Sequence, residues 1–226
     1  MTSEGRLSLR AVLDELDGYY GPTPSPFPTD PFELILWENI AYLANDATKR
    51  EALERLRETV GTRPDQIVRA EPEQLTAITE KGILADDFAL KLKECARIAL
   101  ERFAGDLLTV VEEPAPEAIK ALRAFPGVGE PGAEKILLYC RTHPSLAAES
   151  NGLRVLVRLG LCEDGLSYPA TYAAARDLAN AELGPDFDRM LRARFLLRAH
   201  GQELCRRNEP SCEACALRRG CPTGSA

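Results

Sequence analysis

Four cysteines lie within 17 residues near the C-terminus of this 226-residue sequence, in the run CRRNEPSCEACALRRGC. Six, two and five residues separate them. Four thiolates in so short a run, with a CxxC pair at its centre, predict a metal or iron–sulfur site in a cytosolic protein. A structural zinc ion would use the same ligands, so composition alone leaves zinc and iron–sulfur open. The predicted ligands are Cys205, Cys212, Cys215 and Cys221.

The remaining composition indicates an ordinary folded protein. Hydrophobic residues make up 45% of the chain, which is typical of globular proteins. The N-terminal stretch MTSEGRLSLR lacks the apolar segment of a signal peptide, and no run of 18 apolar residues occurs. We therefore expect a soluble, cytoplasmic protein with no membrane partner, in which disulfides are the weaker alternative. Cys95, Cys140 and Cys162 are expected to be small core residues.

The charge is unevenly distributed. A net charge of −7, taken alone, argues against a nucleic-acid partner. From Arg189 to the C-terminus, however, eight arginines stand against three glutamates, which gives this segment a charge of +5 and leaves −12 on the remainder. A basic end on an acidic body suits a localised polyanion site. An arginine-rich surface exposed to water would explain the same charges equally well.

Helical periodicity dominates the sequence, and strand-like alternation is scarce. The pattern predicts an all-α fold, with a proline-rich extended arm at 18–32. Helices are predicted at 5–17, 32–44, 47–60, 64–69, 73–80, 86–104, 115–124, from about 131 onwards, and at 151–160, 168–183 and 186–203.

The stretch FPGVGEPGAEKIL, residues 125–137, predicts a tight turn followed at once by a helix. Gly127 and Gly129 allow the backbone to turn sharply and to approach a phosphate without an intervening Cβ. The helix that follows supplies free N–H groups and a positive dipole. Such contacts position DNA without reading its sequence. Taken alone, a plain helix–helix turn explains this stretch equally well.

Together, the two motifs point to a known family. The cysteine spacing resembles the cluster loop of the endonuclease III family of DNA repair glycosylases, and LRAFPGVGEPGAEKIL resembles its helix–hairpin–helix. The resemblance implies a [4Fe–4S] cluster rather than zinc. It also implies two helical domains with a DNA-binding cleft between them. We expect a six-helix domain with the helix–hairpin–helix at 31–143, and a cluster domain formed by 1–30 plus 144–226, with the [4Fe–4S] loop at 205–221.

The expected partner is double-stranded DNA containing a lesion, bound by a monomer that is associated with the nucleoid if the source is bacterial. The hairpin backbone and the arginines of the cysteine run are expected to contact phosphates. The predicted DNA-binding residues are Gly127, Val128, Gly129, Arg206, Arg207, Arg218 and Arg219.

One catalytic residue of the family is missing. Bifunctional members carry a lysine two residues after the second hairpin glycine, which attacks the sugar and forms a Schiff base. Pro131 occupies that position here, so we expect no lysine-type strand nicking. Lys135 lies one helical turn further on and could point toward the groove, but a surface lysine is the stronger expectation.

A second residue typical of the family is an aspartate, and this chain has a glutamate, which is one methylene longer, in its place. Its position, eighteen residues after Pro131, holds Glu149 in AAESNGLRV. Asn151 and Arg154 fall where adenine-removing members have an asparagine and a basic residue. We expect Glu149 to stabilise an oxocarbenium-like sugar or to orient water, with Asn151 as the orienting residue. Alternatively, Glu149 is a helix N-terminal residue favoured by the dipole, and Ser150 or Asn151 is its cap.

The segment DPFELILWENIAYLAND carries the third candidate. It places Glu38 where adenine glycosylases have a glutamate that protonates the purine, in an apolar setting that would favour a general acid. Trp37 or Tyr42 would stack on an extruded base, although a core position for Trp37 is the stronger alternative. Leu43 replaces the family's polar plug and would act as an apolar wedge.

The function expected from these residues is that of a monofunctional DNA N-glycosylase, a hydrolase of base-excision repair. The arm YGPTPSPFPTDPFE resembles that of endonuclease III-like proteins that remove alkylated purines, so a damaged, alkylated purine is the expected substrate. The alternative is a DNA-binding or damage-sensing homologue without catalytic activity.

Overall fold

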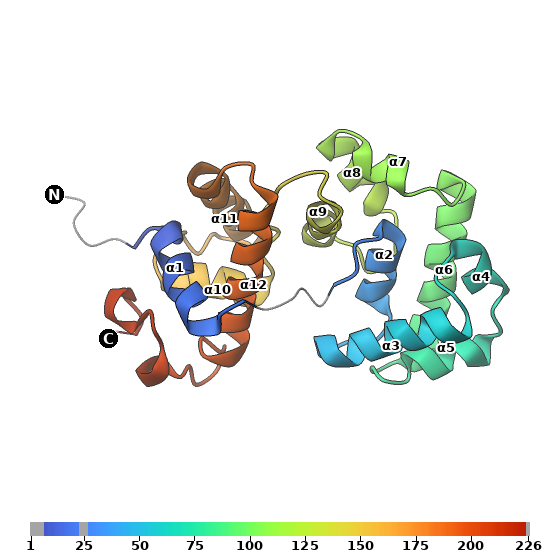
Figure 1. Cartoon of the computed structure of the whole chain (residues 1–226), viewed down its shortest axis with the longest axis horizontal. Helices are drawn as coiled ribbons and strands as arrows, with labels where there is room; N and C mark the ends of the chain where they lie inside the picture. The colour runs from blue at the N-terminus through green and yellow to red at the C-terminus, as the bar shows by residue number, and fades with distance from the viewer. Residues whose placement is uncertain (1–6, 23–26, 225–226) are drawn as a thin grey trace. The chain divides into compact units, whose positions relative to one another are not determined.

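The computed structural model describes residues 7–22 and 27–224 of the chain. The chain divides into two compact units. One unit consists of Met1–Ser25 and Pro144–Ala226, and the other of Pro26–His143 (Figure 1). The chain therefore passes from one unit to the other before Phe27 and returns after His143.

Every regular element in the described ranges is a helix, which confirms the predicted all-α class. The helices follow from periodic apolar positions and from side-chain caps. Ser8, Asp30, Asn45 and Ser167 each accept a hydrogen bond from a backbone N–H in the first turn of the next helix. None of the helices in these ranges combines the length and apolar character needed to cross a lipid bilayer.

Helix α2 is the centre of the unit Pro26–His143. It contacts α3, α6 and α9, which surround it in Figure 1. Leu34, Ile35 and Leu36 are fully buried, as expected for a helix that is apolar on all sides. The helices of this unit are α2 (Pro31–Asn39), α3 (Asp46–Thr59), α4 (Pro64–Arg69), α5 (Pro72–Thr79), α6 (Ala85–Phe103), α7 (Leu108–Glu112), α8 (Ala115–Leu122) and α9 (Glu130–Tyr139).

Three local predictions differ from the structure. Helix α2 ends at Asn39, not at residue 44, and Leu43 has a φ of 61°, which no α-helix accommodates. Buried Ile40 and Ala41 extend the apolar pattern beyond the helix and explain the error. The predicted arm at 18–32 is also too long, because α1 runs to Tyr20 and α2 begins at Pro31, while 23–26 lie outside the described residues. The short helix α7 was not predicted.

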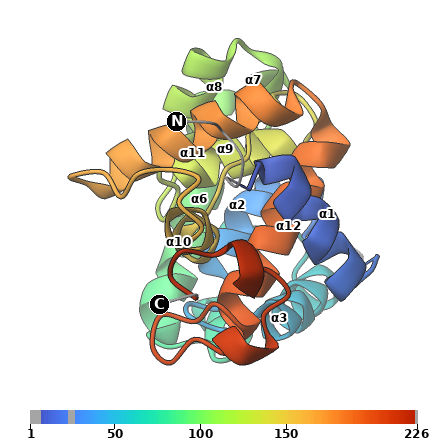
Figure 2. The ribbon, with the colours of Figure 1, turned by 90° about the vertical axis from the view of Figure 1, so that its left-hand side faces the viewer.

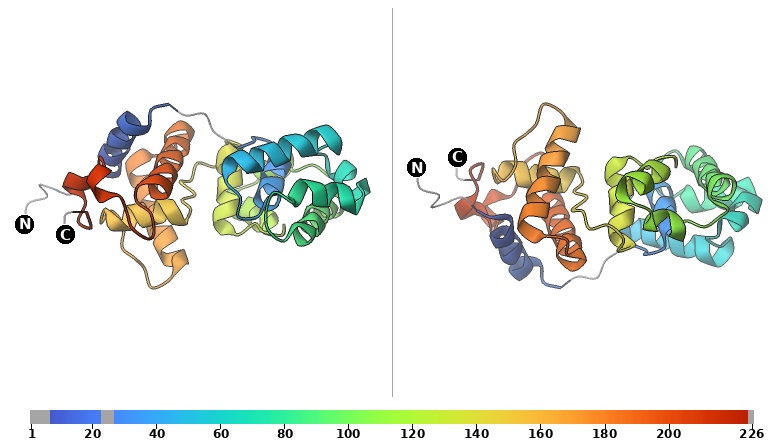
Figure 3. Two further views of the ribbon diagram at one scale, coloured as in Figure 1. Left: turned by 90° about the horizontal axis from the view of Figure 1, so that it is seen from below. Right: turned by 90° about the horizontal axis from the view of Figure 1, so that it is seen from above.

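The other unit is built on α12. Its helices are α1 (Leu9–Tyr20), α10 (Ser150–Arg158), α11 (Tyr168–Leu183) and α12 (Phe187–Glu203), followed by the 3-10 turns η1 (Cys212–Ala214) and η2 (Arg218–Gly220). Helix α12 contacts α1, α10 and α11, and Figure 2 shows it between α1 and α10. The C-terminal segment lies beside α10 in both views of Figure 3.

Two glycines allow α10 and α12 to approach closely. A Cβ added at Gly201 would lie 2.5 Å from the carbonyl oxygen of Asn151, and one added at Gly152 would lie 3.4 Å from the Cβ of Leu197. Contacts shorter than 3.0 Å require the neighbour to move, and here that neighbour is backbone. The crossing therefore sets the position of the N-terminal turn of α10.

We predict that Gly201→Ala lowers the free energy of unfolding by about 1–3 kcal/mol, the usual cost of overpacking a core. Gly18→Ala in α1 is the control, because nothing lies within 4 Å of a Cβ added there. That control should leave stability unchanged or raise it by up to ~1 kcal/mol, since alanine favours helices. Urea unfolding followed by circular dichroism measures both. Equal effects of the two substitutions would contradict the close crossing.

Candidate functional site

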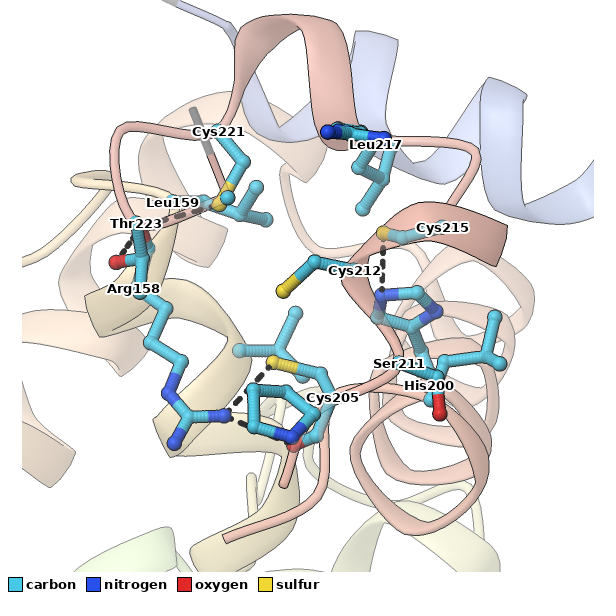
Figure 4. A pocket seen from close by; sticks show the side chains of 15 residues that line it. Arg158, Leu159, His200, Cys205, Ser211, Cys212, Cys215, Leu217, Cys221 and Thr223 are labelled. Carbon is cyan, nitrogen blue, oxygen red and sulfur yellow. Dashed lines mark hydrogen bonds between the residues drawn. The ribbon is translucent and has the colours of Figure 1, made fainter. Parts of the chain in front are cut away.

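The four C-terminal cysteines line one cavity (Figure 4). They lie in the segment 205–221, here called the cysteine loop, which follows α12 and contains η1 and η2. The cavity of about 30 Å³ exceeds the ~10–15 Å³ that one water molecule requires. All seven cysteines, each within the described residues, are free thiols. The loop therefore brings together the four residues that the sequence predicted as ligands.

The C-terminal end of α10 holds this loop in place. The Arg158 guanidinium donates to the carbonyl oxygen of Arg206 at 2.7 Å and to that of Arg207 at 3.1 Å. It also lies 3.5 Å from the sulfur of Cys205. The carbonyl oxygen of Arg158 accepts from Thr223 at 3.0 Å and from Cys221 at 3.5 Å. One residue thus contacts both ends of the loop.

His200 of α12 contacts the side of the cavity opposite Arg158 (Figure 4). Its Nε2 atom lies 3.4 Å from the sulfur of Cys215, and its Nδ1 atom lies 3.3 Å from the hydroxyl of Tyr20 in α1. His200 is buried. It therefore connects the cavity wall to the first helix of the unit.

The donor set suits a bound metal centre. Burial raises the pKa of the Cys215 thiol, and the charges of Cys205, Cys221 and Cys212 add to that shift. A metal centre would offset both effects, because thiolate ligands bind as anions. Four cysteines are the ligands of either a structural zinc or an iron–sulfur cluster. Within the part of the chain that the structure describes, no group of three His, Cys, Asp or Glu side chains is arranged closely enough to hold one metal ion.

The other three cysteines lie outside the cysteine loop. Cys95 and Cys162 are buried, whereas Cys140 is half-buried. Burial raises the pKa of Cys95 and of Cys140 to about 12, so both remain protonated thiols at neutral pH. Cys95 and Cys162 are the core residues that the sequence predicted, and Cys140 is partly exposed.

The last residue of α2 anchors the glycine hairpin, residues 126–129. Asn39, fully buried at the end of α2, donates to the carbonyl oxygen of Pro126 at 2.9 Å. Gly127 has a φ of 78°, and a Cβ added there would lie 2.7 Å from the Oδ1 atom of Asn39. Glycine is therefore required at 127 both for its backbone conformation and for the contact with Asn39.

The hairpin presents backbone rather than side chains. Gly127 and Gly129 are exposed, whereas the side chain of Val128 is buried and anchors the turn. Gly129 is the N-cap of α9, so the N–H groups of the first turn lack helical partners. Pro131 contributes none of them, and Glu130 adds a carboxylate at the same end. This arrangement can bind a phosphate through its backbone.

Lys135 is buried, and the prediction of a surface lysine is wrong. Only 6% of the residue is exposed, and its ammonium forms an ion pair with Glu38 of α2. The physical reason is that α9 packs against α2, and the carboxylate compensates the buried charge. The ring of Phe27 lies over the ammonium, with its centroid 5.3 Å from Nζ. A cation beside Glu38 stabilises its ionised form, which opposes the expected role as a general acid.

Phe27, which lies over this ion pair, belongs to an aromatic cluster. Phe27 contacts Trp37, with ring centroids 5.2 Å apart, and Tyr139, at 4.8 Å. Trp37 is 2% exposed, which corresponds to the core alternative considered for it. In the described structure Phe27 is therefore the ring that contacts the ion pair and is itself only half-buried.

Two exposed apolar loops meet beside the end of α2. Tyr42 and Leu43 are 38% and 73% exposed, and Ile83 and Leu84 are 52% and 59% exposed. The N–H of Ile83 donates to the carbonyl oxygen of Tyr42 at 3.2 Å. A Cβ added at Gly82 would lie 2.4 Å from the backbone nitrogen of Tyr42. Ile83 and Leu84 were not predicted from the sequence, although two apolar residues between a glycine and the acidic start of α6 were a usable signal.

Glu149 is itself the N-cap of α10. One carboxylate oxygen accepts from the N–H of Gly152 at 3.3 Å, and the other accepts from the amide of Asn151 at 2.9 Å. The Oδ1 atom of Asn151 in turn accepts from Arg154 at 2.8 Å. Arg154 also donates to the carbonyl oxygens of Gly201 and Cys205, at 2.6 and 2.9 Å. A chain of hydrogen bonds therefore connects Glu149 to the cysteine loop.

The candidate residues fall into two groups, one in each unit. Pro26–His143 contains Glu38, the hairpin and the apolar residues Trp37, Tyr42 and Leu43. The other unit contains Glu149, Asn151 and the cysteine loop. The four arginines of that loop are exposed: Arg206, Arg207, Arg218 and Arg219.

Comparison with known proteins gives a consistent result. No model of a known protein family matches the sequence. The chain is 25% identical to endonuclease III of Thermotoga maritima over 193 residues, which covers 85% of this chain and 83% of the relative. It is 26% identical to endonuclease III of Sulfolobus acidocaldarius over 197 residues, with 84% and 81% covered.

Solved structures share the fold. A complex of endonuclease III trapped as a covalent intermediate with DNA superposes with a TM-score of 0.75 at 20% identity, covering 97% of this chain and 98% of that one. A thermostable thymine-DNA glycosylase superposes with a TM-score of 0.76 at 16% identity, with 96% of each chain covered.

These similarities define the class as an all-helical, two-domain fold of the helix–hairpin–helix type. This class is narrowed further by the sequence similarity to endonuclease III proteins, by the hairpin before α9 and by the C-terminal cysteine loop. The chain is similar in sequence to endonuclease III proteins over most of its length and shares their fold.

We predict that Gly127→Ala lowers the free energy of unfolding by about 1–3 kcal/mol, because it combines a left-handed backbone with a contact at Asn39. Gly129→Ala is the control: its φ is −85°, and the nearest atom to an added Cβ is 3.9 Å away. That change should cost about 1 kcal/mol or less, because alanine is a poorer N-cap than glycine. Asn39→Ala combined with Gly127→Ala should show coupling of about 0.5–3 kcal/mol in urea unfolding. Strict additivity would contradict the contact.

Proposed function

We propose that this protein is a monofunctional DNA N-glycosylase of base-excision repair, which releases a damaged, alkylated purine from duplex DNA. The proposal is supported by sequence similarity to endonuclease III proteins and by a fold shared with a thymine-DNA glycosylase. The protein would act as a monomer in the cytoplasm or nucleoid.

The observation that carries the chemical part of this proposal is the fixed carboxylate of Glu149. Asn151 and the first turn of α10 hold both of its oxygens. In the proposed reaction the bond from C1′ to the base breaks, and its electron pair leaves with the base. Glu149 stabilises the positive charge left on the sugar. A water molecule oriented by Asn151 then adds to C1′, and the carboxylate accepts its proton.

DNA would be held through backbone and arginine contacts. The N–H groups around Gly127, Val128 and Gly129 would bind one phosphate, and the exposed arginines of the cysteine loop would bind others. The exposed Tyr42 and Leu43, with Ile83 and Leu84 beside them, would fill the space left by the extruded base. Because Pro131 carries no amine, we expect no lyase step at that position.

The cysteine loop would hold a [4Fe–4S] cluster as a structural cofactor. Cys205, Cys212, Cys215 and Cys221 are its expected ligands, and the cavity that they line supports this assignment. When bound, the cluster would hold the loop together and so fix the backbone to which Arg154 and Arg158 donate.

A second candidate is a DNA-binding or damage-sensing protein without catalytic activity. One observation favours it: the carboxylate oxygens of Glu149 serve as the helix cap and as the acceptor for Asn151. Such bonds would hold a structural residue as well as a catalytic one.

We predict that the purified holoprotein releases a base from one class of duplex in a panel with alkylated, oxidised, deaminated and mismatched bases. Strand breaks should be seen only after hot alkali, because hydrolysis leaves an intact abasic strand. Glu149→Gln, which keeps the cap acceptor but removes the charge, should lower the single-turnover rate about 10²-fold or more. Glu163→Gln, an exposed change in the same unit, is the control. DNA binding without release from any lesion would support the second candidate.

We predict that the holoprotein contains about four iron atoms and four sulfides per chain, and that Cys212→Ser loses most of both and unfolds at a lower temperature. Cys162→Ser, in a buried residue outside the loop, should retain the full iron content. Metal and sulfide analysis of protein purified without oxygen measures this. Stoichiometric zinc in the unaltered protein would refute the cluster assignment.

A further inference from the structure

The ion pair between Lys135 and Glu38 connects two elements of the proposed active site. Glu38 lies on the last turn of α2, and Lys135 lies in the second turn of α9, just beyond the hairpin. The side chain of Lys135 is 8% exposed and that of Glu38 is 21% exposed. A buried charge is costly unless it is paired, so each of these groups holds the other in place.

Lys135 also lies on the same face of α9 as Pro131. Residues four apart on a helix are neighbours, and side chains of helical residues lean toward the N-terminus. The stem of Lys135 therefore extends over the turn that contains Pro131. The chain keeps an amine near the position where the resemblance implied a nucleophilic lysine, but here the amine is engaged by a carboxylate.

Glu38 cannot easily move away from this amine. The next residue, Asn39, is fixed by its hydrogen bond to Pro126 of the hairpin. Phe27 covers the ammonium from the side of the arm. Among the charged residues on the elements that pack here, Lys49 of α3 donates to the carbonyl oxygen of Trp37 at 3.1 Å, and Glu134 is buried within α9. Lys135 is the cation that contacts the carboxylate of Glu38.

We propose that Lys135 is a positioning residue that keeps Glu38 ionised, and that the ionised Glu38 restricts the enzyme to purines made cationic by N-alkylation. The inference rests on the proposed glycosylase function and specifies its substrate class. Glu38 would then act as an anion that stabilises positive charge on the sugar and has no proton to donate.

The chemistry of the leaving group explains this restriction. A neutral purine departs as an anion unless an acid protonates it, so its release needs a proton donor. A purine that carries a positive charge from an added alkyl group departs as a neutral base when it takes the electron pair of the glycosidic bond. Water supplies the hydroxyl at C1′, and its second proton passes through a carboxylate to solvent. Such a reaction needs no acid.

The test compares duplexes carrying N7-methylguanine, which is cationic, with duplexes carrying hypoxanthine, which is neutral. The holoprotein should release N7-methylguanine at least 100-fold faster. Lys135→Met should lower kcat for N7-methylguanine at least tenfold at mildly acidic pH, with KM changed less than threefold, because Glu38 then takes up a proton more readily. The acid limb of its pH profile should move to higher pH, since activity requires the ionised carboxylate.

Two variants separate positioning from stability. Lys135→Arg preserves the cation and should restore both the rate and the pH profile to within about threefold of the unaltered protein. Arg57→Met breaks another ion pair of α2, the one with Glu33, and should leave selectivity and pH profile unchanged. If Lys135→Met does not fold, Lys135→Arg and Glu38→Gln still test the inference, because only the second should lose selectivity.

Three results would overturn the inference. Unchanged selectivity and pH profile in Lys135→Met, with lower stability alone, would make the ion pair purely structural. A borohydride-trapped adduct with abasic DNA that requires Lys135 would make this residue a nucleophile. Equal release of both bases by the unaltered protein would remove the substrate restriction while leaving the glycosylase function intact. Release of neither base, nor of any other lesion, would refute that function itself.

Discussion

The C-terminal end of α2 is joined to the hairpin segment by two adjacent polar residues. Asn39 donates to Pro126 on one side of the glycine turn, and Glu38 pairs with Lys135 on the other. Buried polar groups are costly unless they find partners, so these contacts strongly disfavour sliding of α9 along α2. The exposed glycines, the aromatic ring of Phe27 and the loop of Tyr42 and Leu43 all take their positions from this junction.

The other unit depends in a similar way on α10. Glu149 caps its N-terminus, Asn151 lies in its first turn, Arg154 lies in its second turn, and its C-terminal residue is Arg158. Both arginines donate to the carbonyl oxygen of Cys205, at 2.9 and 3.4 Å. The candidate carboxylate and the cysteine loop are therefore attached to opposite ends of one short helix, and neither can shift without disturbing the other.

Local patterns predicted much of this structure, and long-range contacts account for the rest. The helices and the glycine turn could be predicted, because periodicity and glycine geometry act within a few residues. The burial of Lys135 could not, since its partner Glu38 is 97 positions away and a lysine near a helix start is more often exposed. The end of α2 was misplaced for the same reason: Ile40 and Ala41 are buried without being helical. The cap made by Glu149 was overlooked because serine and asparagine are commoner caps.

Helix α10 has only nine residues, and an isolated helix of that length is unstable in water. Its order comes from α12, which approaches closely at Gly201, and from the cysteine loop that both of its arginines contact. Loss of whatever the four thiols bind would therefore act at a distance from the sulfur atoms. The stretch around Glu149 would be among the first to become accessible to proteases and to hydrogen exchange. Oxidation of the thiols would therefore disorder the helix that carries the proposed catalytic carboxylate.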